Sequence, residues 1–180
     1  MRRKGILLTI VALGAATVTA SAQSSAAKIR SAMSAAPASI GAAATVVDWP
    51  DKSGKQATLR AGTNGWTCMP SQAATKYIKV NAMCFDQNFG AMLMALMANK
   101  SPDVKGVGYS YMLSNETRES NTTPFAPAPT ATNEWHHVGP HVMVVYPNGT
   151  MLAGLPTTPS NGPYVMWSGT PYEHVMWPVK

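Results

Sequence analysis

The strongest hydrophobic pattern in the chain is helical and extends over residues 83–100. Its large apolar residues recur at steps of three and four positions, which places them on one face of a helix. They are Phe85, Phe89, Met92, Leu93, Leu96 and Met97. Asp86 lies in the first turn, where the helix dipole favours a negative charge, and Ser101-Pro102 ends the pattern. We therefore predict one principal helix over residues 85–99, whose methionines belong to a packed core rather than to a copper site.

Shorter runs, either apolar or alternating between apolar and polar residues, predict β-strands. They cover residues 44–49, 56–61, 66–69, 106–113, 140–146, 164–167 and 173–179. Asn64-Gly65 separates the second run from the third, and because both residues tolerate positive φ, we predict a hairpin there. Residues 114–133 are polar and proline-rich and predict a long connection, in which Phe125 is the only large apolar residue.

These elements predict an α+β fold, an antiparallel or mixed sheet of short strands packed against one principal helix. The strands outnumber the helices and do not alternate with them, so a doubly wound parallel sheet is disfavoured. We expect a single α+β domain over residues 44–180. The Ala-rich residues 23–43 predict either an N-terminal helix ended by Pro37 or a flexible segment, and the pattern leaves both open.

The first 22 residues have the three parts of a secretory signal peptide. Arg2, Arg3 and Lys4 form a basic start, an apolar run follows over residues 5–19, and Ala20-Ser21-Ala22 supplies the small residues that signal peptidase recognises. The apolar run is too short, and too rich in glycine and threonine, for a good membrane span. We therefore expect cleavage after Ala22 and a periplasmic or secreted product.

Composition excludes some classes of partner. Residues 23–180 contain 11 basic and 8 acidic residues and carry a net charge of +3, which is too mild and too scattered to indicate nucleic acid. The best later apolar stretch is interrupted by Asp86, Gln87 and Asn88, so no membrane span is expected after signal cleavage. The expected partner is an unknown small ligand or an envelope protein.

Cys68 and Cys84 are the two cysteines of the chain. In an oxidising compartment an even number of cysteines favours a disulfide, and we predict one between them. It would join the strand after Asn64-Gly65 to the start of the principal helix. The alternative is a pair of buried free thiols. The wide spacing excludes a Cys-x-x-Cys redox motif, and two thiols alone make a poor zinc site.

Most of the predicted mature chain, residues 45–179, resembles a family of exported bacterial proteins of unknown function. The resemblance lies in Gly62-Thr63-Asn64-Gly65-Trp66-Thr67-Cys68, Met83-Cys84-Phe85-Asp86, Tyr111-Met112-Leu113, Ser120-Asn121-Thr122-Thr123-Pro124, Gly139-Pro140-His141-Val142-Met143 and Gly169-Thr170-Pro171-Tyr172-Glu173-His174-Val175-Met176. The chain departs from that pattern at Thr123, where an aspartate is expected. The resemblance implies export and one compact domain, and it implies no catalytic activity.

The candidate metal ligands are four histidines, His136, His137, His141 and His174. Zinc or copper needs three or four such side chains to converge. His141 and His174 both begin predicted strands, so in adjacent antiparallel strands they would lie at opposite ends. The alternative is that they cap strand ends or line the core. The segments His141-Val142-Met143 and His174-Val175-Met176 share their three residues, too few to define an internal repeat.

No catalytic or cofactor motif stands out, so whether the protein is an enzyme stays open. We carry two hypotheses. The preferred one is a non-catalytic envelope module with no cofactor, which binds a small ligand or partner protein. The alternative is a metal-binding protein or metal-dependent enzyme that uses zinc or copper at the four histidines. Aromatic residues that could line a ligand groove, or equally form core and sheet face, are Trp66, Tyr109, Tyr111, Trp135, Trp167 and Tyr172.

The predicted signal peptide has a direct test. The exported product should begin at or near Gln23, because the Ala20-Ser21-Ala22 segment places the cleavage site there. N-terminal sequencing of protein recovered from the periplasm or the medium measures this. Exported material that still carries Met1 would contradict the prediction.

Overall fold

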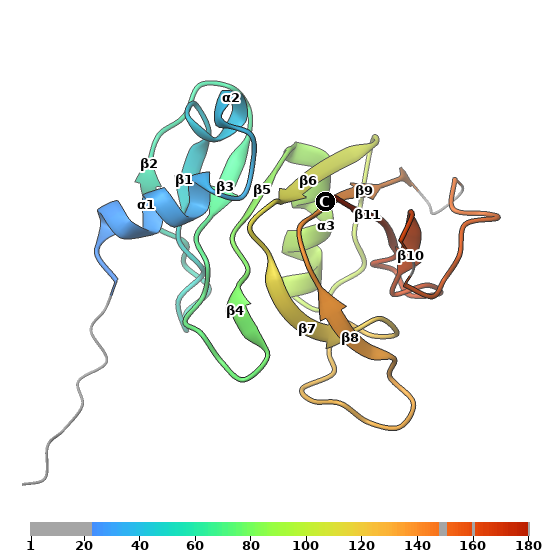
Figure 1. The fold of residues 1–180 in the computed structure, drawn as a ribbon. Helices are drawn as coiled ribbons and strands as arrows, with labels where there is room; N and C mark the ends of the chain where they lie inside the picture. Colours follow the sequence, from blue (N-terminus) through green and yellow to red (C-terminus); the bar gives the residue numbers. More distant parts are fainter. Residues whose placement is uncertain (1–22, 148–150, 160, 180) are drawn as a thin grey trace, which may run out of the picture.

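The computed structural model describes residues 23–147, 151–159 and 161–179, so the predicted signal peptide lies outside the described residues. At the centre is an eight-stranded mixed sheet, which we call sheet A (Figure 1). Its strands, in spatial order, are β10 (Tyr164–Met166), β11 (His174–Pro178), β9 (His141–Val145), β6 (Gly108–Met112), β5 (Met83–Phe85), β3 (Thr67–Met69), β1 (Thr45–Val47) and β2 (Thr58–Arg60). Neighbouring strands are antiparallel except β1 and β3, which are parallel.

A second, three-stranded antiparallel sheet, sheet B, has the order β4 (Ile78–Val80), β7 (Glu116–Ser120), β8 (Trp135–Val138). Figure 1 shows its strands side by side, below the middle of sheet A in that view. The main hydrophobic core joins buried residues of both sheets and of the principal helix, among them Met143 of β9 and Val138 of β8. We call the face of sheet A that bears this core the inner face.

The principal helix, α3 (Gln87–Met97), packs on the inner face against β6 and β9. Asp86 caps it, because its carboxylate accepts from the backbone N–H of Phe89 at 2.9 Å and from that of Tyr109 at 2.9 Å. Gly108 allows this close approach, since a Cβ on that residue would lie 2.3 Å from the Phe89 nitrogen. The helix therefore begins after residue 86.

The predicted start of the helix is wrong for residues 85 and 86, because residues 83–85 form strand β5. This strand is paired on both edges, with β3 and with β6, and its extended backbone continues through the helix cap. The predicted helix therefore begins two residues too early. Periodicity alone does not distinguish a short, fully buried strand from a buried turn of helix.

The N-terminal segment is helical, in agreement with one of the two alternatives. Helix α1 (Ser25–Met33) begins at Ser24, whose hydroxyl accepts from the Ala27 N–H, and the short α2 (Ala38–Gly41) follows Pro37. On the outer face of sheet A, α1 packs against β3 and covers a small core of alanines, Val46 and the two cysteines.

Two further predictions about local structure are wrong. Strands β2 and β3 are not paired, because β1 lies between them, so Asn64-Gly65 does not form a hairpin. Gly65 does take positive φ, at 78°, while the Asn64 side chain accepts from the Trp66 N–H and donates to the Ile40 carbonyl. Residues 116–120 of the expected long connection form strand β7. In both cases the observed structure depends on which strands pair with one another, and the local sequence pattern does not contain that information.

The predicted disulfide is confirmed, because Cys68 and Cys84 are bonded. They are directly opposite one another in the antiparallel pair β3–β5, and both are fully buried. The bond therefore joins two neighbouring strands of sheet A rather than a strand and the helix. The α+β fold class is also confirmed, with the two sheets contributing more than the helix. Within the described residues, no helix has the length and apolar character needed to cross a membrane.

Loss of the disulfide should destabilise the protein measurably. The bond closes a loop with a sequence separation of 16 residues, so reduction should lower the free energy of unfolding by about 3 kcal/mol. Urea denaturation with and without reductant measures the change. An unchanged unfolding midpoint, in a sample whose two thiols have been shown to react with an alkylating agent, would contradict the expectation.

Candidate functional site

A cavity of about 500 Å³ lies between the inner face of sheet A and sheet B. Its lining is mostly apolar and includes five methionines. The residues from sheet A and the segment after β10 are Met83, Met112, His141, Met143, Met166, Trp167, His174 and Met176. Those from sheet B, its flanks and the loop after β7 are Thr75, Tyr77, Ile78, Asn81, Thr117, Arg118, Glu119, Ala126, Pro127 and Trp135. Two sheets that meet over a large methionine-rich surface thus enclose a space of ligand size.

A larger groove of about 1330 Å³ runs along the start of α1 and residues 71–80. Its lining mixes polar and charged residues with apolar ones such as Trp49 and Ile78. No buried, unpartnered side-chain atom of the described residues belongs to its lining, whereas two such atoms belong to residues of the inter-sheet cavity. We therefore take the inter-sheet cavity as the candidate site.

The floor of the cavity is set by strand register. Met112 of β6 lies directly opposite His141 of β9, and Met143 of β9 lies directly opposite Met176 of β11. Directly opposite residues of an antiparallel pair share a face, so these four side chains form one continuous patch on the inner face. Only the pairing of three strands that are distant in sequence brings them together.

His141 and His174 are both buried in this floor and are held in the same way. The Nδ1 atom of His141 bonds the Gly139 carbonyl at 2.7 Å, and that of His174 bonds the Tyr172 carbonyl at 2.9 Å. Since a carbonyl only accepts, Nδ1 carries the hydrogen in each ring and Nε2 carries the free lone pair. The Nε2 atom of His174 is buried without a hydrogen-bond partner.

Burial keeps both imidazoles neutral. It lowers the pKa of His141 to about 4, with a smaller contribution in the same direction from the nearby His174, and it lowers the pKa of His174 to about 4. The bonds to the two carbonyls favour the protonated form but are outweighed by desolvation. His174 also packs edge-on against the rings of Phe89 and Trp167, at 6.0 and 5.0 Å between centroids.

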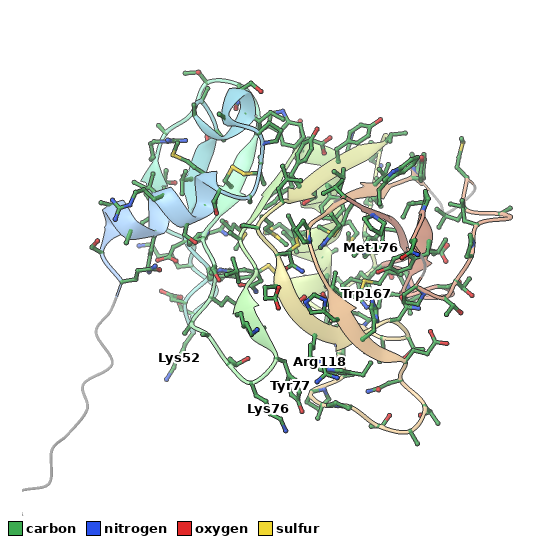
Figure 2. All side chains as sticks on the ribbon, viewed as in Figure 1. Lys52, Lys76, Tyr77, Arg118, Trp167 and Met176 are labelled. Atoms are coloured by element: carbon green, nitrogen blue, oxygen red, sulfur yellow. A yellow bond between two sulfur atoms is a disulfide. The ribbon has the colours of Figure 1, made fainter. Side chains whose placement is uncertain are left out.

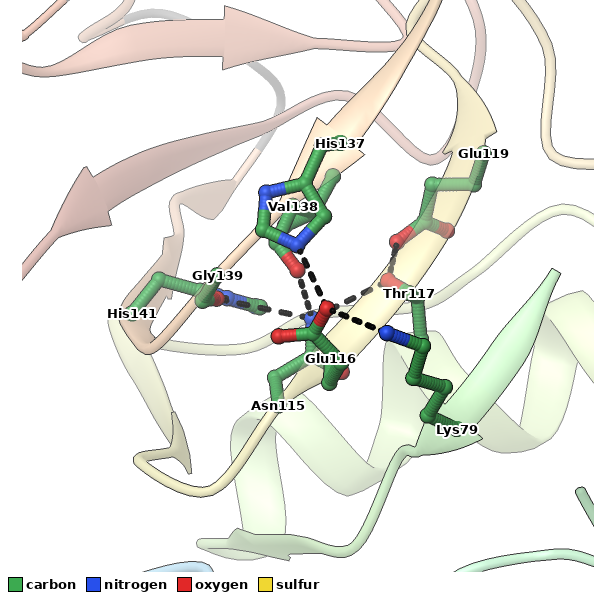
Figure 3. A network of polar contacts seen from close by, with 9 residues as sticks. All are labelled: Lys79, Asn115, Glu116, Thr117, Glu119, His137, Val138, Gly139 and His141. Atoms are coloured by element: carbon green, nitrogen blue, oxygen red, sulfur yellow. Dashed lines mark hydrogen bonds and ion pairs between the residues drawn. The ribbon is translucent and has the colours of Figure 1, made fainter.

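Glu119 brings a carboxyl group to the lining of the cavity from sheet B. Figure 3 shows the chain of hydrogen bonds that holds it: the Asn115 amide donates to Thr117 Oγ1 at 3.0 Å, and the Thr117 hydroxyl donates to Glu119 Oε1 at 3.0 Å. Desolvation raises the pKa of Glu119 despite this bond. The Asn115 amide also donates to the Val138 carbonyl at 2.7 Å, so the network joins β7 to the end of β8.

Two tryptophans complete the walls. Trp135 packs edge-on against the ring of Tyr77, at 4.8 Å between centroids, and its indole N–H is buried without a partner. Trp167 has a φ of 56°, which is unusual for a bulky residue, and it is held there by hydrogen bonds from its indole to the Ser120 carbonyl and from its backbone N–H to the Asn121 carbonyl. Such strain persists where the surroundings over-determine it, as at binding sites.

The mouth of the cavity carries positive charge. Arg118 lines it from β7 and is exposed, and among the described residues its guanidinium has no hydrogen-bond or ion-pair partner. Lys76 lies near Arg118 in the fold, and the Lys76 ammonium is 5.3 Å from the centre of the Tyr77 ring. Figure 2 shows Lys76, Tyr77 and Arg118 at the same edge of the molecule, with Trp167 and Met176 deeper inside.

The four candidate histidines do not converge on one site: His136, His137 and His141 line a small pocket of about 150 Å³, and His174 does not belong to its lining. His137 is exposed and pairs with the carboxylate of Glu116, which also forms an ion pair with Lys79 (Figure 3). These two contacts hold the pKa of Glu116 below its ordinary value. His136 lies within 3.3 Å of the Tyr164 hydroxyl, outside the lining of the cavity. No group of three or more His, Cys, Asp or Glu residues in the described part of the chain could hold a metal ion.

The candidate aromatic residues are also divided by the fold. Trp135 and Trp167 line the cavity. Trp66 packs against Tyr111, with ring centroids 5.4 Å apart, beside the small core on the outer face of sheet A. Tyr109 is exposed and does not belong to the cavity lining. The Tyr172 hydroxyl donates to the Lys100 carbonyl, and the Tyr172 ring packs edge-on against the ring of Phe125.

Sequence reasoning missed Glu119, Thr117 and the methionines of the cavity floor. Thr117 and Glu119 stand at alternate positions of a segment that looked like a polar connection, so their period of two was the available signal. The five cavity methionines lie one to a strand, so no periodicity distinguishes a cavity floor from an ordinary core.

Comparisons with known proteins do not extend these observations. No family model matches the chain, and neither the curated proteins nor the solved structures include a significant match. The resemblance to exported bacterial proteins therefore stays a prediction.

The two buried histidines predict a loss of stability in mild acid. Their pKa is near 4 in the folded protein and 6.5 in a free side chain, so the unfolded chain binds more protons as the pH falls from 6.5 towards 4. The stabilisation that a neutral His174 provides is present above pH 6.5 and is lost across this interval.

Replacement His174→Asn isolates this effect, because asparagine can still donate to the Tyr172 carbonyl but does not titrate. The stability advantage of the wild type over this variant should shrink as the pH falls from 7 to 4.5. Urea unfolding of both proteins at a series of pH values measures the difference, in which the opposite effect of Glu119 cancels. A difference that stays constant would contradict the expected titration of His174.

Proposed function

We propose that this chain is an exported, non-catalytic binding protein that takes a small ligand into the cavity between its two sheets. The observation that supports this most directly is the cavity itself: about 500 Å³, mostly apolar, with a small number of polar groups directed into it. Small-molecule sites in proteins have this size and composition.

The polar groups of the cavity favour a ligand of mixed character. The methionines and aromatic rings offer soft apolar contact to its body, and the unpartnered indole N–H of Trp135 offers a hydrogen bond to an acceptor on it. The free guanidinium of Arg118 at the mouth favours an anionic end group. An apolar or aromatic molecule that ends in a carboxylate or sulfonate meets all three conditions.

Two observations support export. The buried Cys68–Cys84 disulfide is typical of proteins outside the reducing cytoplasm, and the chain begins with the segments of a signal peptide. We favour a non-catalytic role because no catalytic or cofactor motif stands out in the amino-acid sequence.

Fluorescence of 8-anilinonaphthalene-1-sulfonate, an anionic aromatic probe, tests this function. The probe should bind with one site per chain, and its emission should rise and shift to the blue. Replacement Ala126→Trp should weaken binding at least tenfold, because Ala126 lines the cavity and the indole would occupy its space. Replacement Arg118→Gln should weaken binding about tenfold through loss of a charged hydrogen bond.

Matched control variants separate the cavity from general adhesion of the probe. Ala131→Trp adds the same ring to an exposed position of the same loop, and Lys52→Gln removes an exposed charge, both outside the cavity lining. Both should bind the probe like the wild type. Equal binding by Ala126→Trp and Ala131→Trp, or no saturable binding by the wild type, would reject the proposed function.

A further inference from the structure

The duplicated segments His141-Val142-Met143 and His174-Val175-Met176 become neighbours in the fold. They lie on the adjacent antiparallel strands β9 and β11, with Met143 directly opposite Met176. Because side chains alternate along a strand, each histidine shares the inner face with the methionine two residues after it. The antiparallel direction therefore places one imidazole on each side of the methionine pair, roughly 7 Å along the strands from it.

All four side chains are buried on the floor of one cavity. Their exposed fractions are 3% for His141, 6% for Met143, 1% for His174 and 1% for Met176, and each contributes to the cavity lining. This arrangement is a set of two sulfur and two nitrogen atoms, related by the local two-fold symmetry of an antiparallel strand pair.

The histidines are oriented as metal ligands are. Each donates from Nδ1 to the backbone carbonyl two residues before it, which fixes the ring and leaves the lone pair on Nε2. A hydrogen bond from Nδ1 to a backbone carbonyl is typical of histidines that bind metals through the other ring nitrogen. The Nε2 atom of His174 is buried without a partner, an arrangement that costs stability unless something occupies the position next to it.

We propose that the two His-Val-Met segments form a binding site for Cu(I). Thioether sulfur is a soft ligand that selects Cu(I), imidazole suits copper as well, and a set of neutral N and S donors has little to offer calcium or magnesium. Cu(I) accepts two to four such ligands, so the two sulfurs and Nε2 of His174 suffice. The carboxyl of Glu119 lines the same cavity and can balance the added charge.

A purely structural role explains less. Methionine fills irregular cores well, so Met143 and Met176 alone need no metal. Leucine would serve equally, however, and packing gives no reason for a histidine two residues before each methionine or for the orphaned nitrogen of His174. The inference goes beyond the proposed function and does not depend on it, because the donors are side chains of the cavity floor itself.

Anaerobic competition with the Cu(I)–bicinchoninate complex tests the site on the untagged, purified chain. The protein should withdraw one equivalent of Cu(I). Replacements Met143→Leu, Met176→Leu and His174→Asn should each weaken the binding at least tenfold, and the Met143→Leu/Met176→Leu pair should abolish it. Leucine keeps the volume and apolar character of methionine, so these variants should stay folded. X-ray absorption of the wild-type complex, which needs no variant, should show both sulfur and nitrogen neighbours around copper.

Met92→Leu is the matched control, since Met92 is buried in α3 and does not line the cavity. It should bind Cu(I) like the wild type, and Zn²⁺ should not displace the copper. The proposal is overturned if the wild type withdraws no Cu(I), if the paired methionine variant binds as tightly as the wild type, or if copper has only nitrogen and oxygen neighbours. Probe binding with failed copper binding rejects this inference alone, and the reverse rejects only the small-ligand function.

Discussion

The pairing of β9 with β6 on one side and β11 on the other is the interaction on which the rest of the structure depends. Met112 opposite His141 and Met143 opposite Met176 define the floor on which α3 and sheet B both pack. Because side chains alternate, a slip of one residue in either ladder would exchange the inner and outer faces of a strand. Register here therefore decides the core, the cavity and the placement of both buried histidines together.

Among the described residues, five buried side-chain polar atoms have no hydrogen-bond partner, and two of them belong to residues that line the cavity. The indole N–H of Trp135 and Nε2 of His174 lack partners, Glu119 is held with a raised pKa, and Trp167 has an unfavourable φ. Each of these features costs free energy of folding. In the proposed function, groups of a bound ligand would satisfy the two atoms of Trp135 and His174 that the fold leaves unpaired. The buried Cys68–Cys84 disulfide and the hydrogen-bonded pairing around it join β3 to β5 in sheet A.

Local patterns identified several elements correctly. The helical period found α3, with an error of two residues at each end, and the cysteine count predicted the disulfide. Apolar runs located β9 and β11, and their antiparallel pairing places His141 and His174 at opposite ends, as the positions of the two histidines in their strands predicted. Reasoning from turn chemistry failed at Asn64-Gly65, because a turn specifies the local backbone while the partner of each strand is chosen by the whole sheet. Strand β7 was missed for a related reason, since its polar residues form a strand only because β4 and β8 lie on both sides of it.

The amino-acid order alone determined properties that depend on near neighbours: the period of the principal helix and the twin His-Val-Met segments. The export signal stays a prediction. Tertiary structure alone decided which of these residues share a space. Met143 and Met176 are separated by more than thirty positions along the chain but are directly opposite in the sheet, and Glu119 reaches the same cavity from a different sheet. The physical reason is that strand partners are selected by burial and hydrogen bonding summed over many residues, so no short stretch of sequence contains the information that assembles the site.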